Sequence, residues 1–196
     1  MRPREAARLT GGVRLTGGVD VAPLHSSDAE RLAAAYSRNR DHLAPWEPAR
    51  SGRFFTPAGQ REVIDAKAAL VEAGSEVPWV LLRNGQVVGT VTITGIVRGP
   101  FLNGHLGYWV DSELTGRGIG SAAVAFAVAA ARDVLGLHRL QAATLPLNTA
   151  SQRVLDRAGF EEIGVARAYL SIAGRWQDHR LYQRILEPSG AAAVRE

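Results

Sequence analysis

The chain has 196 residues, of which 46% are hydrophobic and 21% are charged. A chain of this length and composition can bury a core of its own, which excludes wholesale disorder, a collagen-like fold and a coiled coil. Cysteine is absent, so disulfides, thiolate metal sites and a cysteine nucleophile are excluded as well. We expect one globular domain without a metal.

The formal charge is +4, and the basic residues, 22 arginines and Lys67, are scattered from Arg2 to Arg195. Proteins that bind nucleic acid gather basic residues in one patch or stripe, so we expect no nucleic-acid partner. The longest apolar stretch, 122–131, has ten residues, whereas a membrane-spanning helix needs about 20. The N-terminus leads into no apolar signal segment, and we expect a cytoplasmic protein without a membrane anchor.

The N-terminal region contains a tandem repeat, because 8–13 and 14–19 both read Arg-Leu-Thr-Gly-Gly-Val. A period of six residues is too short for a solenoid, so we expect residues 1–18 to form a flexible arm. Residues 188–196 have the composition of a flexible tail. No linker divides the region 19–187 between them, which predicts a single domain.

Hydrophobic periodicity and turn signals predict an alternation of strands and helices along this domain. Asn84-Gly85 between two β-rich runs is a strong hairpin signal, and it predicts an antiparallel meander that precedes a strand-helix-strand unit. The predicted strands are 19–24, 79–82, 87–96, 104–110, 138–145, 160–169 and 175–186, and the predicted helices are 26–40, 56–74, 116–135 and 148–158. The expected fold class is therefore α/β (α+β), with a mixed, mostly antiparallel central sheet of about seven strands flanked by about four helices.

The segment 115–121, Thr-Gly-Arg-Gly-Ile-Gly-Ser, lies between a predicted strand and a predicted helix. Bare amides at a helix N-terminus, together with the helix dipole, can bind an anion, so the segment predicts a phosphate-binding loop. The alternative is a glycine-rich turn that serves only the backbone geometry. A Walker loop is excluded because no lysine precedes Ser121, and a dinucleotide-binding loop is disfavoured because Thr144-Leu145 stands where an acid is expected.

The loop itself contains Arg117-Gly118-Ile119-Gly120, and further motifs stand on both sides of it. Gly107-Tyr108-Trp109-Val110 precedes it, and 145–151, Arg153-Val154-Leu155 and Ala158-Gly159-Phe160 follow it. Two more segments, 39–46 and 174–179, lie toward the two ends of the domain. Together they resemble the GNAT superfamily of acetyltransferases, and within it the RimJ/RimL-like branch that acetylates protein N-termini and other amines. The resemblance covers about 19–186 and implies acetyl-CoA as the cosubstrate.

The chemistry of acetyl transfer assigns roles within these motifs. The transfer needs an N–H donor for the carbonyl oxygen, for which we name the Val110 N–H, and a proton for the departing thiolate, for which we name Ser151. If the central strand splays from its neighbour near Trp109, its free backbone groups can bind the pantetheine arm. Asn148 is expected to bond this arm, the alternative being that it only caps the next helix. The expected cofactor-binding residues are Trp109, Val110, Arg117, Gly118, Ile119, Gly120, Ser121, Asn148 and Ser151.

The sequence leaves the general base open. Some similar proteins carry a glutamate where this chain has Ala168. We name His105 as the catalytic candidate, while proton removal through water and an amine that arrives neutral are alternatives. The other titratable residues near the presumed cleft are Asp111, Glu113 and His179, and the residues expected to line the acceptor pocket, or else to belong to the core, are Tyr36, His42, Trp46 and Tyr169.

We therefore expect an enzyme that transfers an acetyl group from acetyl-CoA to a primary amine by direct attack in a ternary complex. The acceptor is a protein N-terminal residue, a free amino acid, a polyamine or an amine-bearing antibiotic. The alternative function is an acetyl-CoA-binding sensor without efficient catalysis, which Ala168 favours. The oligomeric state stays open, with a homodimer as one option.

Overall fold

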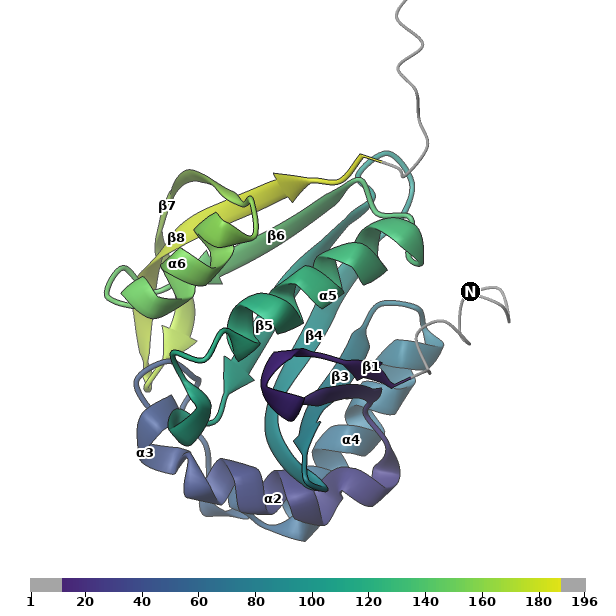
Figure 1. The fold of residues 1–196 in the computed structure, drawn as a ribbon. Coiled ribbons are helices and arrows are strands. Elements are labelled where there is room, and N and C mark those ends of the chain that lie inside the picture. The colour runs from purple at the N-terminus through teal and green to yellow at the C-terminus, as the bar shows by residue number, and fades with distance from the viewer. Residues whose placement is uncertain (1–11, 188–196) are drawn as a thin grey trace, which may run out of the picture.

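The structure is a computed structural model that describes residues 12–187; most of the expected arm and the expected tail, at 1–11 and 188–196, lie outside the described residues. One sheet runs through the described chain in the strand order β1-β2-β3-β4-β5-β6-β8-β7 (Figure 1). Its strands are β1 (Val13–Arg14), β2 (Asp20–Pro23), β3 (Val77–Arg83), β4 (Gln86–Val97), β5 (Asn103–Val110), β6 (Arg139–Thr144), β7 (Glu161–Ile172) and β8 (Arg175–Ile185). Neighbouring strands are antiparallel except β5 and β6, which are parallel. The predicted fold class is confirmed, with eight strands rather than about seven.

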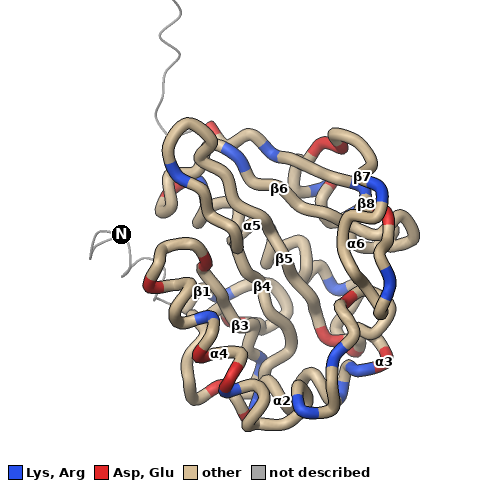
Figure 2. The backbone as a smooth tube through the Cα atoms, turned by 180° about the vertical axis from the view of Figure 1, so that it is seen from behind, with Lys and Arg blue, Asp and Glu red and all other residues tan. Residues whose placement is uncertain are grey.

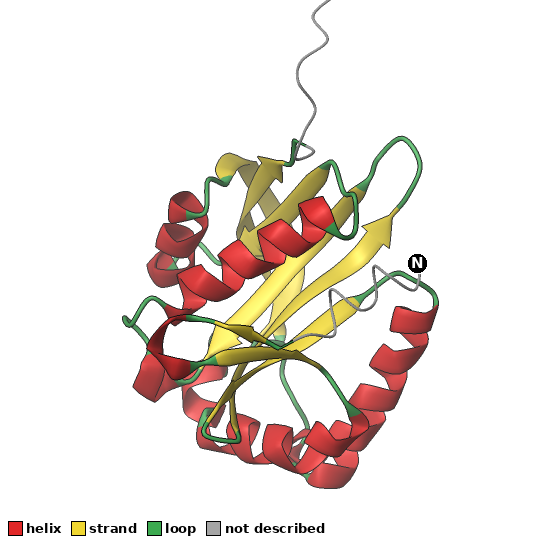
Figure 3. Cartoon of the chain, turned by 45° about the vertical axis from the view of Figure 1, so that its right-hand side comes forward, coloured by secondary structure: helices red, strands yellow, loops and turns green. Residues whose placement is uncertain are grey.

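Helices cover both faces of this sheet, with α2 and α4 on one face and α5 and α6 on the other (Figure 3). The α-helices are α2 (Ala29–Arg38), α3 (Arg40–Leu43), α4 (Pro57–Glu72), α5 (Ile119–Asp133) and α6 (Thr149–Arg157), and the 3₁₀ helices are η1 (Thr16–Gly18), η2 (Ser26–Asp28), η3 (Gly52–Phe55) and η4 (Ser112–Leu114). The single-turn helix α3 is the α-helix that the sequence pattern did not separate from its neighbour. The two faces therefore offer two separate layers in which a site can form.

The expectation of a flexible arm up to residue 18 is wrong for its last residues. Strand β1 pairs with β2, Arg14 forms an ion pair with Asp20 at 3.4 Å, and Leu15 packs against the core. Gly17 and Gly18 have φ angles of 68° and 71°, which glycine adopts readily, and they turn the chain back on itself. The second copy of the repeat is thus a strand and a turn at the edge of the sheet.

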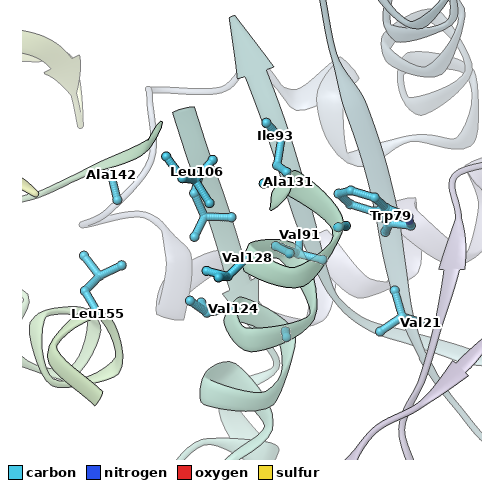
Figure 4. Close-up of a cluster of buried hydrophobic side chains, with 14 of the residues drawn as sticks. Val21, Trp79, Val91, Ile93, Leu106, Val124, Val128, Ala131, Ala142 and Leu155 are labelled. Carbon is cyan, nitrogen blue, oxygen red and sulfur yellow. The ribbon is translucent and has the colours of Figure 1, made fainter. Parts of the chain in front are cut away.

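The alanine-rich helix α5 packs on the centre of the sheet. Ala123, Ala127 and Ala131 are fully buried, and these small side chains let the helix lie close to β4 and β5 (Figure 4). Trp79 and Leu106 face the same layer from the strands. This packing fixes the N-terminus of α5 next to the end of β5.

Figure 2 marks Lys and Arg in blue and Asp and Glu in red, and residues of both signs are spread over most of the elements. Within residues 12–187 no helix is long and apolar enough to cross a membrane. The same residues contain no group of three or more His, Asp or Glu side chains that could hold a metal ion.

The sheet opens between β5 and β6. The two strands are paired only at Asn103–His105 and Arg139–Gln141, and beyond these residues they diverge (Figure 1). β6 continues its pairing with β8, and β5 continues its pairing with β4. The C-terminal half of β5 therefore has a free edge that faces the gap.

Candidate active site

The free edge of β5 presents unpaired backbone groups. The N–H of Asp111 donates to the carbonyl oxygen of Val88 on β4 at 2.8 Å. Because backbone groups point alternately to the two sides along a strand, the N–H and C=O of Tyr108 and Val110 point away from β4 and into the gap. A linear ligand with amide groups can hydrogen-bond to such an edge as an added strand would.

The glycine loop lies at the open end of this gap. Gly116 and Gly118 have φ angles of 73° and 78°, so the turn into α5 requires the left-handed conformation that glycine tolerates. Gly118 is the N-cap of α5, and no side chain caps the helix. The amides of the first turn, at Ile119, Gly120 and Ser121, are thus available to an anion, beside the exposed Arg117.

Gly120 has no packing reason to be a glycine. A Cβ atom built there would lie 3.7 Å from Val154 Cγ2 and 3.8 Å from Val110 Cγ2, which is ordinary contact distance. Alanine would also be the better helix former at this position. The glycine leaves the first-turn amides without a side chain at this position, which suits a group that approaches such amides closely, and a pyrophosphate is such a group.

Two hydroxyl groups meet across the gap. Ser151 Oγ on α6 lies 2.8 Å from the Tyr108 hydroxyl on β5. Asn148 Oδ1 accepts from the Ser151 N–H at 3.1 Å, so Asn148 caps α6. Burial raises the pKa of Tyr108 to about 12, against a smaller lowering by the hydrogen bond to Ser151, so the phenol keeps its proton at neutral pH. Tyr108 was not predicted as a site residue, although its alternation with Trp109 along the strand places it on the α6 face.

The end of α2 holds the segment between β5 and the glycine loop. Asp111 accepts hydrogen bonds from Arg38 Nε at 2.8 Å and from Asn39 Nδ2 at 2.9 Å, while Asn39 Oδ1 accepts from the Ser112 N–H at 2.9 Å. These bonds use the Asn39 side chain as a bracket, and α2 ends at Arg38 rather than at the expected Arg40. Burial alone would raise the pKa of Asp111, but the hydrogen bonds from Asn39, Arg38 and the Glu113 N–H outweigh it and lower the pKa. Asp111 thus serves as a structural anchor.

A cavity of about 420 Å³ lies on the other face of the sheet, between the strands and helices α2 and α4. Its wall includes Gly107, Tyr108 and Trp109, the stretch of β5 that borders the gap. Tyr36, an expected acceptor-pocket residue, lines this cavity, and its hydroxyl accepts a hydrogen bond from Trp109 Nε1 at 3.1 Å. Trp109 was expected to offer backbone groups to the cofactor, but strand alternation turns its indole into this opposite layer and its backbone groups point toward β4. The groups that are open to the gap are those of Tyr108 and Val110.

This cavity contains a carboxyl group that the sequence analysis did not single out. The Glu47 side chain is 21% exposed, and its nearest charged partner is Arg50 Nε at 3.9 Å. Burial raises the pKa of Glu47, and the Arg50 charge opposes this shift only in part. The only signal in the sequence is that Glu47 stands between Pro45-Trp46 and Pro48, directly after the segment 39–46 that resembles the family.

The predicted base candidates lie elsewhere. His105 is half-buried near the start of the gap, 3.5 Å from Asn103 Nδ2, and burial lowers its pKa. His179 is buried with Nδ1 at 2.9 Å from the Gln177 carbonyl oxygen. Together with Asp111 and the exposed Glu113, they line neither this cavity nor the second one described below.

A second cavity, of about 520 Å³, lies next to the Glu47 side of the first one and is bordered by the β7–β8 turn. Trp46, which was expected to line the acceptor pocket, lines this second cavity together with Leu147 and Trp176. Leu147 is 85% exposed and Trp176 is 69% exposed. The predicted pocket residues His42 and Tyr169 line neither cavity, and the Tyr169 ring lies against His179 at 5.7 Å. The Ala173 N–H in the β7–β8 turn donates to the Glu47 carbonyl oxygen at 2.9 Å, which joins the borders of the two cavities.

Comparison with known proteins identifies the family of this chain. The model of the acetyltransferase (GNAT) domain matches residues 19–161. The [Ribosomal protein uS5]-alanine N-acetyltransferase of Escherichia coli is 34% identical over 172 residues, which cover 86% of this chain and 89% of the relative.

Two solved structures agree with the fold as well. The ribosomal-protein-S5-alanine acetyltransferase of Vibrio fischeri is 37% identical with a TM-score of 0.85, over 90% of this chain and 97% of that one. The Mycobacterium smegmatis RimJ in complex with CoA-disulfide is 31% identical with a TM-score of 0.84, over 89% of this chain and 86% of that one. The chain belongs to the GNAT acetyltransferase family and is an acetyl-CoA-dependent N-acetyltransferase.

Proposed function

We propose that the chain acetylates the N-terminal amine of a polypeptide. The observation that carries this proposal is the contact between the cavity at Glu47 and the stretch Gly107–Trp109, whose backbone also borders the gap in the sheet. An amine in the cavity and a thioester in the gap would meet at this stretch. The relatives in E. coli and V. fischeri are named for the alanine of a ribosomal protein, which supports a protein acceptor and a cytoplasmic location.

The second cavity supports a polypeptide rather than a small amine. Exposed apolar side chains of this size are unusual on a surface that contacts only water, and Trp46, Leu147 and Trp176 gather at one cavity. Residues that follow an acetylated N-terminus would leave the first cavity past Trp46. These three side chains would then contact the acceptor chain.

In this function, the amides of 118–121 and Arg117 bind the pyrophosphate of acetyl-CoA. The free N–H and C=O groups of Tyr108 and Val110, with Asn148 beside them, bind the pantetheine arm. Bound acetyl-CoA supplies an acetyl thioester, which the amine attacks directly in a ternary complex. The Val110 N–H donates to the carbonyl oxygen. Ser151 gives a proton to the departing sulfur, and the Tyr108 hydroxyl can return one to Ser151 because the two oxygens lie 2.8 Å apart.

A screen of CoA release tests this proposal. Peptides with a free N-terminal alanine or serine are compared with the same peptides blocked at the N-terminus, with polyamines and with aminoglycosides. Release that depends on a free peptide N-terminus is the expected result. Faster release with a polyamine or an aminoglycoside would overturn the polypeptide acceptor, and calorimetric binding of acetyl-CoA without release for any amine would favour the sensor.

A further inference from the structure

We propose that Glu47 is the general base that removes the proton from the acceptor amine. This inference rests on the proposed function, because it concerns the same site. It assigns a residue to the proton transfer, for which the methyl group of Ala168 cannot serve. The side chain of Glu47 borders the cavity that adjoins the free edge of β5.

The other titratable groups of the cavity cannot take this role. They are Tyr36, Arg50 and Lys67; Tyr108 also borders the cavity, but its hydroxyl lies in the opposite layer, against Ser151. Burial raises the pKa of Tyr36 to about 12, so this phenol keeps its proton at neutral pH. Arg50 and Lys67 are cations, and the Lys67 ammonium is ion-paired with Glu76. Glu47 is the one carboxylate among the residues that line this cavity.

The backbone of Glu47 is fixed from two sides. Its N–H donates to the Leu43 carbonyl oxygen of α3 at 3.1 Å, and its carbonyl oxygen accepts from the Ala173 N–H at 2.9 Å. Arg50, which stacks on the Phe54 ring at 4.5 Å, approaches the carboxylate without forming a close ion pair, since Nε lies 3.9 Å away. The carboxylate thus stays free to accept a proton from a substrate.

The proton balance of the transfer is complete with this residue. The Glu47 carboxylate takes one proton from the ammonium group and later releases it to water. The freed electron pair of nitrogen forms the N–C bond as the C–S bond breaks, and sulfur leaves with that bond's electron pair. Ser151 gives sulfur a proton and takes one back from the Tyr108 hydroxyl, which is in turn reprotonated by the second proton that nitrogen loses. The third stays on the amide.

The dependence of kcat/KM on pH separates this role from a structural one. Wild type binds the ammonium form and deprotonates it, so we expect kcat/KM to stay level below the amine pKa of about 8, down to the raised pKa of Glu47. The Glu47→Gln variant must use the neutral amine, so kcat/KM should fall about tenfold per pH unit below about pH 8. Near pH 6.5, about 1.5 units lower, this fall alone gives a loss of roughly thirtyfold relative to wild type.

Two further variants and one control sharpen the test. Glu47→Asp keeps a carboxylate and should recover the level profile at a lower rate, while Arg50→Ala should move the acidic limb to higher pH because a stabilising cation is lost. The exposed Glu72 on α4 provides Glu72→Gln as a matched control that leaves the profile unchanged. Acetyl-CoA affinity and the melting temperature establish that each variant is folded.

The results distinguish this inference from the proposed function. If wild type releases CoA with a free peptide N-terminus and Glu47→Gln has a parallel pH profile and an equal rate, Glu47 is not the base and the function stands. If wild type fails to release CoA with each of the amines tested, the proposed function itself fails. A steeper profile for Glu47→Gln than for wild type supports Glu47 as the base.

Discussion

The substitution Gly120→Ala should move stability and cofactor affinity in opposite directions. The added methyl group meets Val154 and Val110 at 3.7 and 3.8 Å, so it fits the protein without a clash. Alanine in place of glycine in a helix stabilises by up to about 1 kcal/mol. For a domain of this size that gain corresponds to a melting temperature higher by roughly 2–4 °C at most.

Under the proposed assignment, the same methyl group stands next to the amides that would bind the pyrophosphate and weakens their close approach to it. Losing one hydrogen bond to a charged phosphate oxygen costs about 1.5–3 kcal/mol, which corresponds to a dissociation constant for acetyl-CoA that is roughly 10- to 150-fold higher. Calorimetric titration and thermal melting of the purified protein measure the two effects. Gly52→Ala is the control, because a Cβ atom there meets nothing within 4 Å and Gly52 lies outside the glycine loop. An unchanged acetyl-CoA affinity in a folded Gly120→Ala protein would refute the assignment of this loop.

Three more substitutions test the proton donor to sulfur, the bracket at Asp111 and the backbone at Ala168. Ser151→Ala should lower turnover at least about tenfold with little change in acetyl-CoA affinity, and unchanged turnover would mean that water protonates the sulfur. Asn39→Ala removes the bracket on Asp111 and Ser112 and should raise the KM for acetyl-CoA several-fold more than it lowers kcat, which steady-state kinetics measure; an effect confined to kcat would contradict the bracket. Ala168 has a φ angle of 46°, so Ala168→Gly should stabilise the fold by up to about 1 kcal/mol in urea unfolding, and a lower midpoint would contradict this strain.

The order and type of the elements could be predicted because each depends on local signals. The turn at Asn84 and Gly85 has positive φ angles at both residues and joins β3 to β4. Gly118 and Gly159 mark the start of α5 and the end of α6. Signals of this kind need only the neighbouring residues, and they survive without knowledge of the tertiary structure.

The parts that sequence analysis missed depend on contacts between distant residues. Strand β1 forms because a two-residue segment finds β2, and no periodicity can appear in two residues. Glu47 becomes a candidate base only because α2, α4 and β5 enclose it, and its sequence neighbours give no sign of that burial. Tyr108 gains its hydrogen-bond partner, Ser151, from a helix that begins some forty residues later.

The homodimer that the sequence analysis names as one option stays a prediction.

The most direct test is to incubate the protein with acetyl-CoA and a peptide that begins with alanine, and to locate the added mass by tandem mass spectrometry. We expect one acetyl group on the α-amine, none on the peptide blocked at its N-terminus, and little product with Glu47→Gln near pH 6.5. An acetyl group found only on lysine side chains, or no modified peptide despite bound acetyl-CoA, would contradict it.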